Sequence, residues 1–247
     1  MIELYTTDYR RRDYSPAGGI VKSFVVGEDC GNVLPGTYGD MRTQHWVWQN
    51  RHEIDIVGFQ HYRKHFNFAT PADWMTNPVY GQGGLSFEHF RDYQRWLNDW
   101  SGDTIVEMLG VCDVIVTNPF DVSYNENDTI DFCRTRSGSD WAMLVQVMER
   151  HFAGFDYRMH KITCHNMFIM KAKLFREYME FWWHVCQELR PLVTGDGGDT
   201  LYKSRMMAVL SERIFNLWLH WRPQWHGVVK KQLKVLTCPM VVCWGLS

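Results

Sequence analysis

The chain has 247 residues, of which 45% are hydrophobic, so it is long enough to bury a substantial core in one large domain. Its net charge is −2, which argues against a partner as acidic as nucleic acid. The seven cysteines include no CxxC pair, a pattern typical of a reducing compartment rather than of a disulfide framework.

Targeting and membrane signals are absent from the sequence. The N-terminal stretch MIELYTTDYRRR lacks the long apolar core of a signal peptide. No window reaches the roughly 18 apolar residues that a membrane span needs. We therefore expect a cytoplasmic protein. The basic, aromatic segment 223–236 has two interpretations, a peripheral contact with a membrane surface or an ordinary surface strand or helix, and the second is the commoner.

Segments of strand and helix character alternate along the chain. The expected order is strand 2–7, strand 20–26, helix 38–52, strand 53–60, loop 71–84, helix 86–100 with Ser86 as N-cap, strand 111–120, helix 139–152, strand 162–170, helix 172–189, turn 194–199 and helix 201–221. This alternation predicts an α/β fold. No internal repeat, low-complexity segment or linker divides the sequence, so we expect one domain over residues 1–247.

The basic stretch His61-Tyr62-Arg63 directly follows the strand expected at 53–60. Open α/β sheets bind ligands beyond the carboxyl ends of their strands, so these side chains are expected at a binding crevice. A guanidinium binds phosphate oxygens bidentately, and an imidazole can donate to them. The stretch therefore indicates a site for a phosphorylated ligand. A surface turn with solvated charges is the alternative, and residue chemistry alone weighs the two equally.

Glu212 lies on an expected helix that is apolar on almost every side. A carboxylate in that setting is either paired, with Arg213 or Arg205 as partner, or exposed to a pocket. In a pocket, burial would raise its pKa and suit it to general-base catalysis. A structural ion pair is the commoner role for a single helical glutamate, so both interpretations stay open.

His165 and Asn166 interrupt the apolar strand expected at 162–170. Adjacent strand residues point to opposite faces, so only one of the two could face a given pocket. Polar side chains inside an apolar strand need hydrogen-bond partners, and a bonded pair in the core is the commoner role.

Aromatic residues make up 15% of the chain and include 12 tryptophans. Their rings can stack on sugars, although for most of them filling the core is the expected role. The sequence has no HExxH, no zinc spacing of Cys and His, no Asp-x-Asp, no Walker loop, no GxGxxG and no GxSxG.

Four stretches, in order, resemble a known family: YGDMRTQHWVWQN (38–50), IDIVGFQHYRKHF (54–66), HNMFIMKAKLFREYMEFWWHV (165–185) and LSERIFNLWL (210–219). The family is the bacterial capsular-polysaccharide and lipopolysaccharide glycosyltransferases long catalogued as a domain of unknown function, whose characterised members are similar to β-galactofuranosyltransferases. The resemblance covers about residues 38–220. Asp40 stands where the family usually has Glu, and Gln60 stands where it usually has Cys.

The resemblance implies a single-domain, Rossmann-like fold of the GT-A type, with helical elaboration and a nucleotide-sugar crevice at the strand ends. The implied reaction moves a hexosyl unit, galactofuranose or galactose, from a UDP-sugar to a growing surface polysaccharide by inverting single displacement. The acceptor would be lipid-linked or an oligosaccharide, and the protein could contact the inner membrane or other assembly enzymes. A retaining transferase, a carbohydrate-binding protein without catalysis and a structural partner of a larger synthase are the alternatives.

The resemblance also implies roles for particular residues. Arg63, with help from His61 or Lys64, would meet the diphosphate where most GT-A enzymes hold a metal on Asp-x-Asp. No cofactor is then expected, and Mn²⁺ or Mg²⁺ held by Asp40 or Asp55 is the alternative.

Two further roles come from the same resemblance. Glu212 would be the catalytic base. The loop 67–84 and the segment 86–100, with Trp74 and Trp96, would form the acceptor side. The remaining donor and diphosphate contacts implied by the family pattern are Tyr62, Asp40, His165 and Asn166.

Overall fold

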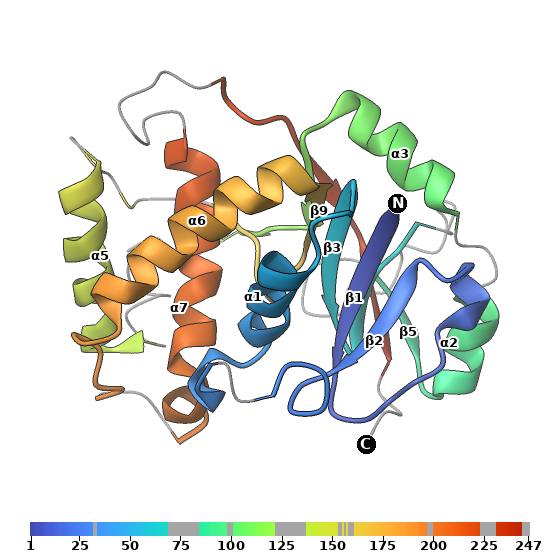
Figure 1. Cartoon of the computed structure of the whole chain (residues 1–247), viewed down its shortest axis with the longest axis horizontal. Helices are drawn as coiled ribbons and strands as arrows, with labels where there is room; N and C mark the ends of the chain where they lie inside the picture. The colour runs from blue at the N-terminus through green and yellow to red at the C-terminus, as the bar shows by residue number, and fades with distance from the viewer. Residues whose placement is uncertain are drawn as a thin grey trace.

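A mixed β-sheet forms the centre of the computed structural model (Figure 1). The strands β1 (Ile2–Asp8), β2 (Val21–Val25), β3 (Ile56–His61), β6 (Val114–Thr117) and β10 (Val235–Cys238) run parallel, and β9 (Phe168–Lys171) runs antiparallel between β3 and β6. The predicted α/β class is therefore confirmed. The structure describes residues 1–31, 34–68, 84–97, 101–121, 137–152, 155, 157, 161–196, 200–222 and 231–243.

Three short strands extend the sheet from the end of β3. β4 (Lys64–Phe66) turns back antiparallel from β3 and pairs with β11 (Met240–Cys243), which pairs in parallel with β5 (Gly84–Phe87). A separate two-stranded sheet joins β7 (Phe120–Asp121) to β8 (Lys161–Ile162). The tight connection from β3 to β4 fixes residues 61–64 at the carboxyl edge of the central sheet.

Alternate residues of the central strands enter two hydrophobic cores, because successive side chains of a strand point to opposite faces. Val57 and Phe168 belong to the core covered by α1 (Met41–Asn50), α5 (Ser139–His151), α6 (Ala172–Leu189) and α7 (Thr200–Trp221). Ile56 and Ile169 belong to the core covered by α2 (Phe90–Trp96) and α3 (Gly102–Val111). Short 3₁₀ turns lie at η1 (Ser15–Ala17) and η2 (Gly36–Tyr38).

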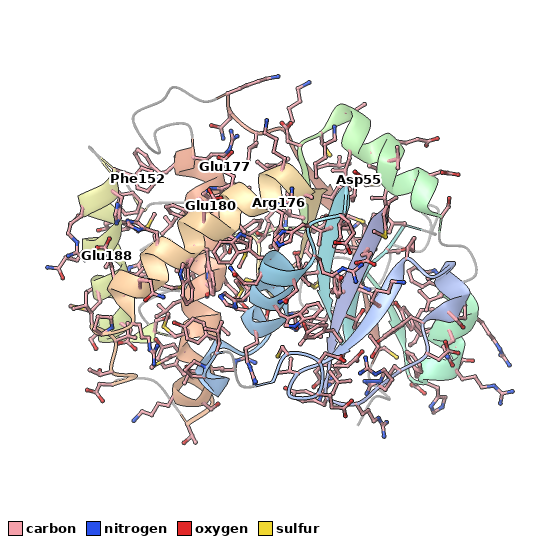
Figure 2. The ribbon with its side chains drawn as sticks, viewed as in Figure 1. Asp55, Phe152, Arg176, Glu177, Glu180 and Glu188 are labelled. Carbon is pink, nitrogen blue, oxygen red and sulfur yellow. The ribbon has the colours of Figure 1, made fainter. Side chains whose placement is uncertain are left out.

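The long helix α6 illustrates the apolar stripe expected from its sequence. Tyr178, Phe181 and Val185 are fully buried on its inner side. The exposed Glu180 lies on its outer side (Figure 2). None of the described helices combines the length and the hydropathy needed to cross a bilayer.

The tryptophans of the described ranges fill space between elements. Trp182 and Trp218 are fully buried. Trp96 packs on Phe87 and Tyr93, with ring centroids 6.1 and 5.5 Å away. The core-filling role expected for most of these rings is therefore confirmed for these three residues.

Several predicted boundaries are wrong, each for a local reason. The helix expected at 86–100 begins only at Phe90, because Ser86 pairs in β5 and His89 is the N-cap. The helix α3 was not predicted; Ser101 caps it by accepting from the backbone N–H of Asp103 at 3.1 Å. The expected loop 71–84 lies almost wholly outside the described residues, as does the greater part of segment 223–236.

The helix expected at 38–52 begins at Met41, because Gly39 has φ +49, in the left-handed region. The turn expected at 194–199 is described only as far as residue 196. These shifts leave the order of the main helices and strands as the sequence predicts.

Gly58 lies in β3, between β1 and β9. A methyl group there would lie 2.5 Å from Leu4 Cδ2 and 2.7 Å from Ile169 Cγ1. We expect Gly58→Ala to lower the free energy of unfolding by about 1–3 kcal/mol, because overpacking forces neighbours to shift. In α3, a methyl group at Gly110 would meet nothing within 4 Å. Gly110→Ala is the matched control and should raise stability by at most about 1 kcal/mol. Equal urea midpoints for the Gly58 variant and the wild type would contradict the expected crowding.

Candidate functional site

A cavity of about 480 Å³ opens at the carboxyl ends of β1, β2 and β3. Its other walls come from the segment Gly36–Arg42 and from the first half of α7. The residues that line it are Thr7, Asp8, Tyr9, Val26, Gly36, Gly39, Asp40, Arg42, His61, Tyr62, Arg63, Lys64, His165, Ser204, Arg205, Ala208, Val209 and Glu212. Of the residues predicted as the catalytic base or as donor and diphosphate contacts, all but Asn166 line this cavity.

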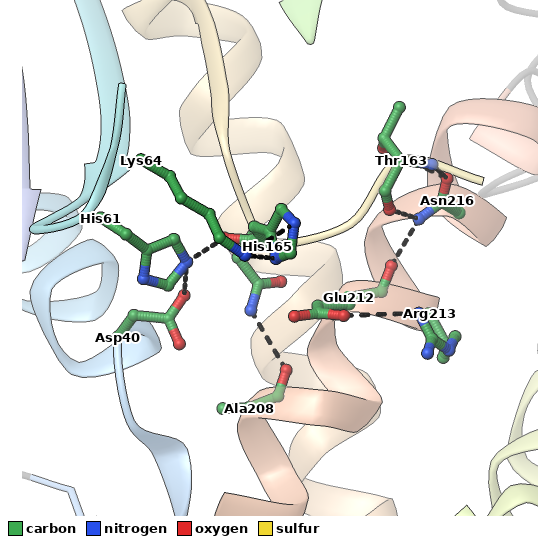
Figure 3. Close-up of polar contacts among 10 residues, drawn as sticks. Asp40, His61, Lys64, Thr163, His165, Ala208, Glu212, Arg213 and Asn216 are labelled. Atoms are coloured by element: carbon green, nitrogen blue, oxygen red, sulfur yellow. Dashed lines mark hydrogen bonds and ion pairs between the residues drawn. The ribbon is translucent and has the colours of Figure 1, made fainter. Parts of the chain in front are cut away.

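His61 is the last residue of β3 and is held from two sides (Figure 3). Its Nε2 lies 2.5 Å from the backbone oxygen of His165 and 3.6 Å from Asp40 Oδ2. Burial, reinforced by the charge of nearby Lys64, lowers the pKa of His61 to about 4. The imidazole is therefore neutral near pH 7, with its proton on Nε2, where it donates to the carbonyl. The contact with Asp40 is then not an ion pair.

His165 faces the cavity from a turn rather than from a strand. Its φ is +78 and that of Asn166 is +51, so the strand predicted over 162–170 is broken here and β9 begins only at Phe168. Lys64 Nζ lies 3.0 Å from Nε2 and 3.1 Å from Nδ1 of the imidazole (Figure 3). Burial, with a further contribution from Lys64, lowers the pKa of His165 to about 2. The ring is thus a neutral acceptor for the lysine.

Asn166 does not line the cavity and holds the surrounding elements together instead. Its Nδ2 donates to the carbonyl of Ala208 on α7 at 3.1 Å. Its own backbone oxygen accepts from Gln44 Nε2 of α1 at 2.9 Å. The hydrogen-bonded core role therefore describes Asn166, whereas its neighbour His165 faces the cavity.

Asp40 directly precedes α1 and lines the cavity beside His61. Burial raises the pKa of its carboxyl group to about 6, although a hydrogen bond with Asn166 and the charge of Arg205 act in the other direction. Near neutral pH this carboxylate keeps a charge in a poorly hydrated position.

Glu212 combines the two arrangements that the sequence left open. It lines the cavity, and its Oε2 accepts from Arg213 Nη1 at 3.4 Å. The side chain is 15% exposed, so it is accessible from the cavity without being free in solvent. One helical turn later, Asn216 Nδ2 donates to the carbonyls of Glu212 and Thr163 at 2.6 and 2.7 Å. Asn216 therefore links the helix that carries Glu212 to the segment that leads into the turn with His165 (Figure 3).

Tyr62 and Arg63 form the outer lip of the cavity. The Arg63 guanidinium lies 4.8 Å from the centre of the Tyr62 ring, and the Tyr62 ring contacts Tyr9 edge-on at 4.9 Å. Arg63 is exposed, and within the described ranges its side chain makes no hydrogen bond or ion pair. This arrangement directs a positive charge to the mouth of the cavity.

Arg205, which the sequence suggested only as a possible partner of Glu212, lines the cavity, and so does Arg42, which was not predicted. Arg205 has non-helical angles (φ −142, ψ 27) and marks a kink inside α7, which helical periodicity does not reveal. Asp8 and Tyr9 could have been found, because they end the first strand at the same sheet edge. Asp8 Oδ1 already accepts a hydrogen bond from Arg12 Nη1 at 2.9 Å, so Asp8 forms part of the cavity wall.

A divalent metal on a diphosphate is held by one or two carboxylates together with the phosphates themselves. Asp55 is not available for this, because it lies at the opposite end of β3, exposed and paired with the N-terminal amino group (Figure 2). Of the two residues named as metal ligands, Asp40 lines the cavity and Asp55 does not. Within the described ranges, the cavity holds no three His, Cys, Asp or Glu residues with ligand atoms within 4.8 Å of one another.

The predicted acceptor side is only partly visible. Trp96 belongs to the core beneath α2 and does not line the cavity. Trp74 and nearly all of the loop 67–84 lie outside the described residues.

The raised pKa of Asp40 predicts how the stability of the protein changes with pH. The folded protein holds this proton more tightly than the unfolded chain, whose ordinary pKa is 3.8, so the contribution of Asp40 to stability falls as pH rises from about 4 to about 6. In urea unfolding, Asp40→Asn should gain stability relative to wild type over that interval, by up to about 3 kcal/mol at about 1.4 kcal/mol per pKa unit. Asp92→Asn, an exposed control on α2, should track the wild type. Parallel profiles for Asp40→Asn and wild type would contradict the assignment.

Comparisons with known proteins bear on the fold and on the family. The apo structure described as WbbM bifunctional glycosyltransferase is similar to this chain, with a TM-score of 0.75, 18% identity, and coverage of 98% of this chain and 45% of that chain. This likeness confirms the predicted GT-A-like fold, and the chain spans less than half the length of that protein. No curated protein sequence gives a significant match. The family described as "Domain of unknown function (DUF4422)" matches residues 33–223, and the chain therefore belongs to that family.

Proposed function

We propose that the chain is a glycosyltransferase. It would transfer a hexosyl unit, galactofuranose or galactose, from a UDP-sugar to a growing surface polysaccharide with inversion at the anomeric carbon. The observation that carries the proposal is the composition of the cavity, where cations at the end of β3 face a carboxylate on α7. The likeness in fold to a described glycosyltransferase supports the same conclusion.

The cations suit a diphosphate. Arg63, Lys64 and Arg205 all line the cavity, and a guanidinium group is in general protonated at any relevant pH. A guanidinium fork matches phosphate oxygens, so these residues would neutralise the charge that builds up on UDP as it leaves. At the end of β3, these cations would neutralise the diphosphate, as a metal ion held by Asp-x-Asp does in most GT-A enzymes.

Glu212 suits a general base. Arg213 engages Oε2, which orients the carboxylate, and the side chain lines the cavity. As the acceptor oxygen bonds to the anomeric carbon, the bond from that carbon to UDP breaks with its electron pair leaving on the β-phosphate. The proton of the acceptor hydroxyl passes to Glu212. One displacement with one base inverts the anomeric configuration.

Calorimetry of UDP binding tests the clamp. We expect wild type to bind UDP in the presence of EDTA and Arg63→Ala to bind at least tenfold more weakly, because a hydrogen bond to a charged group contributes about 1.5–3 kcal/mol. Arg91→Ala, an exposed arginine on α2, is the matched control and should bind as wild type does. Binding only with Mn²⁺ would overturn the metal-free clamp. No UDP binding in either condition would favour a carbohydrate-binding or structural protein.

Turnover of Glu212→Gln tests the base. The variant should bind UDP normally while transfer from a UDP-hexose falls by about 10²–10⁴-fold, the usual contribution of a general base. Glu180→Gln on the outer side of α6 should leave turnover unchanged. NMR of the product linkage separates inversion from retention. Full activity of Glu212→Gln would remove this residue from the chemistry.

A further inference from the structure

A second cluster of polar side chains lies where α5 meets α6, and none of its members lines the cavity. His151 is the last residue of α5, whereas His184 and Glu188 lie one turn apart on α6. Figure 2 labels Glu188 and the neighbouring Phe152 at this end of the molecule. The proposed glycosyl transfer uses none of these three side chains.

The ligand atoms of the cluster converge on one point. Nε2 of His151 lies 2.8 Å from Glu188 Oε1, and Nε2 of His184 lies 3.4 Å from the same oxygen. All three atoms lie within 4.8 Å of one another. Donor atoms at about 2.0–2.1 Å from a tetrahedral zinc ion are about 3.3 Å apart, so the spacing is close to what such an ion requires.

The surrounding structure holds this arrangement in place. The spacing of four residues puts His184 and Glu188 on the same side of α6. Phe152 packs on Phe181, with ring centroids 5.9 Å apart, which fixes the end of α5 beside α6. Arg150 Nη2 bonds Glu188 Oε2 at 3.1 Å, which orients the carboxylate and leaves Oε1 for the two imidazoles.

We propose that His151, His184 and Glu188 form a binding site for a transition-metal dication, with Zn²⁺ as the best match. Two imidazoles and one carboxylate are ligands that Zn²⁺ favours, whereas Mg²⁺ and Ca²⁺ favour oxygen alone. The side chains of His151, His184 and Glu188 are 19%, 57% and 30% exposed, so an ion can enter and water can complete its coordination. Each neutral imidazole would bind through Nε2 with its proton on Nδ1.

A bound ion would join α5 to α6. These helices lie side by side at one end of the molecule (Figure 1), and α6 packs on α7, which carries Glu212. Because binding to the folded state alone raises stability by mass action, the ion should raise the melting temperature.

The test measures Zn²⁺ binding by calorimetry and the melting temperature with and without Zn²⁺. Wild type should bind one ion with a Kd in the micromolar range and melt at a higher temperature when the ion is present. His184→Ala removes an exposed ligand, so it should fold normally, bind at least tenfold more weakly and lose the shift. Mg²⁺ should not raise the melting temperature.

Two control variants locate the ion. His52→Ala removes an exposed histidine elsewhere, and His61→Ala removes the cavity histidine; both should keep the Zn²⁺-dependent shift. No zinc binding by wild type would show that the cluster is hydrogen-bonded only and would overturn the proposal. A shift that survives in His184→Ala but disappears in His61→Ala would place the ion in the cavity and overturn it equally. None of these outcomes depends on UDP binding or turnover.

Discussion

The cavity depends on how the buried turn before β9 is held. Asn216 of α7 accepts from the backbone N–H of Thr163 at 2.8 Å and donates to its carbonyl at 2.7 Å. Gln44 of α1 donates to the carbonyl of Asn166, and His61 of β3 approaches the carbonyl of His165 at 2.5 Å. A buried polar group left without a partner costs about 1–3 kcal/mol, so the turn requires all three elements to close around it.

The same three elements carry the principal polar groups of the cavity. Asp40 precedes α1, His61 ends β3, and Glu212 lies on α7. Hydrogen bonds that satisfy the turn thereby also fix the separations between these groups. Left-handed backbone at two successive non-glycine residues persists only where its surroundings determine it, and here the bonds to the turn supply that determination.

Sequence periodicity was sufficient for the elements that bury one broad stripe. The helix expected at 172–189 matches α6, and the strand expected at 2–7 is one residue shorter than β1. Sequence periodicity was insufficient at the turn before β9. The segments 162–164 (ITC) and 167–170 (MFIM) flank this turn and are largely apolar, so the sequence reads as one continuous strand. It also missed the kink at Arg205, since the residues around it keep helical spacing.

Site residues show the same division. The stretch His61-Tyr62-Arg63 could be placed because the end of a parallel strand in an α/β sheet is a known position in space. Arg42 could not, because its position depends on how η2 packs against α7, a contact between segments far apart in the sequence. Strand ends are thus predictable site positions, whereas walls formed by helix packing require the structure.

Burial changes the pKa of the ionisable groups in the cavity in a direction that depends on their chemical type. The two cavity histidines have lowered pKa values and are neutral at physiological pH, so they act through hydrogen bonds. Guanidinium groups resist this effect, because arginine in general stays protonated at neutral pH. Asp40 has a raised pKa, which weakens the opposing negative charge as pH falls toward 6. The cationic side chains that line the cavity, Arg63, Lys64 and Arg205 among them, therefore suit the anionic ligand proposed above, a diphosphate.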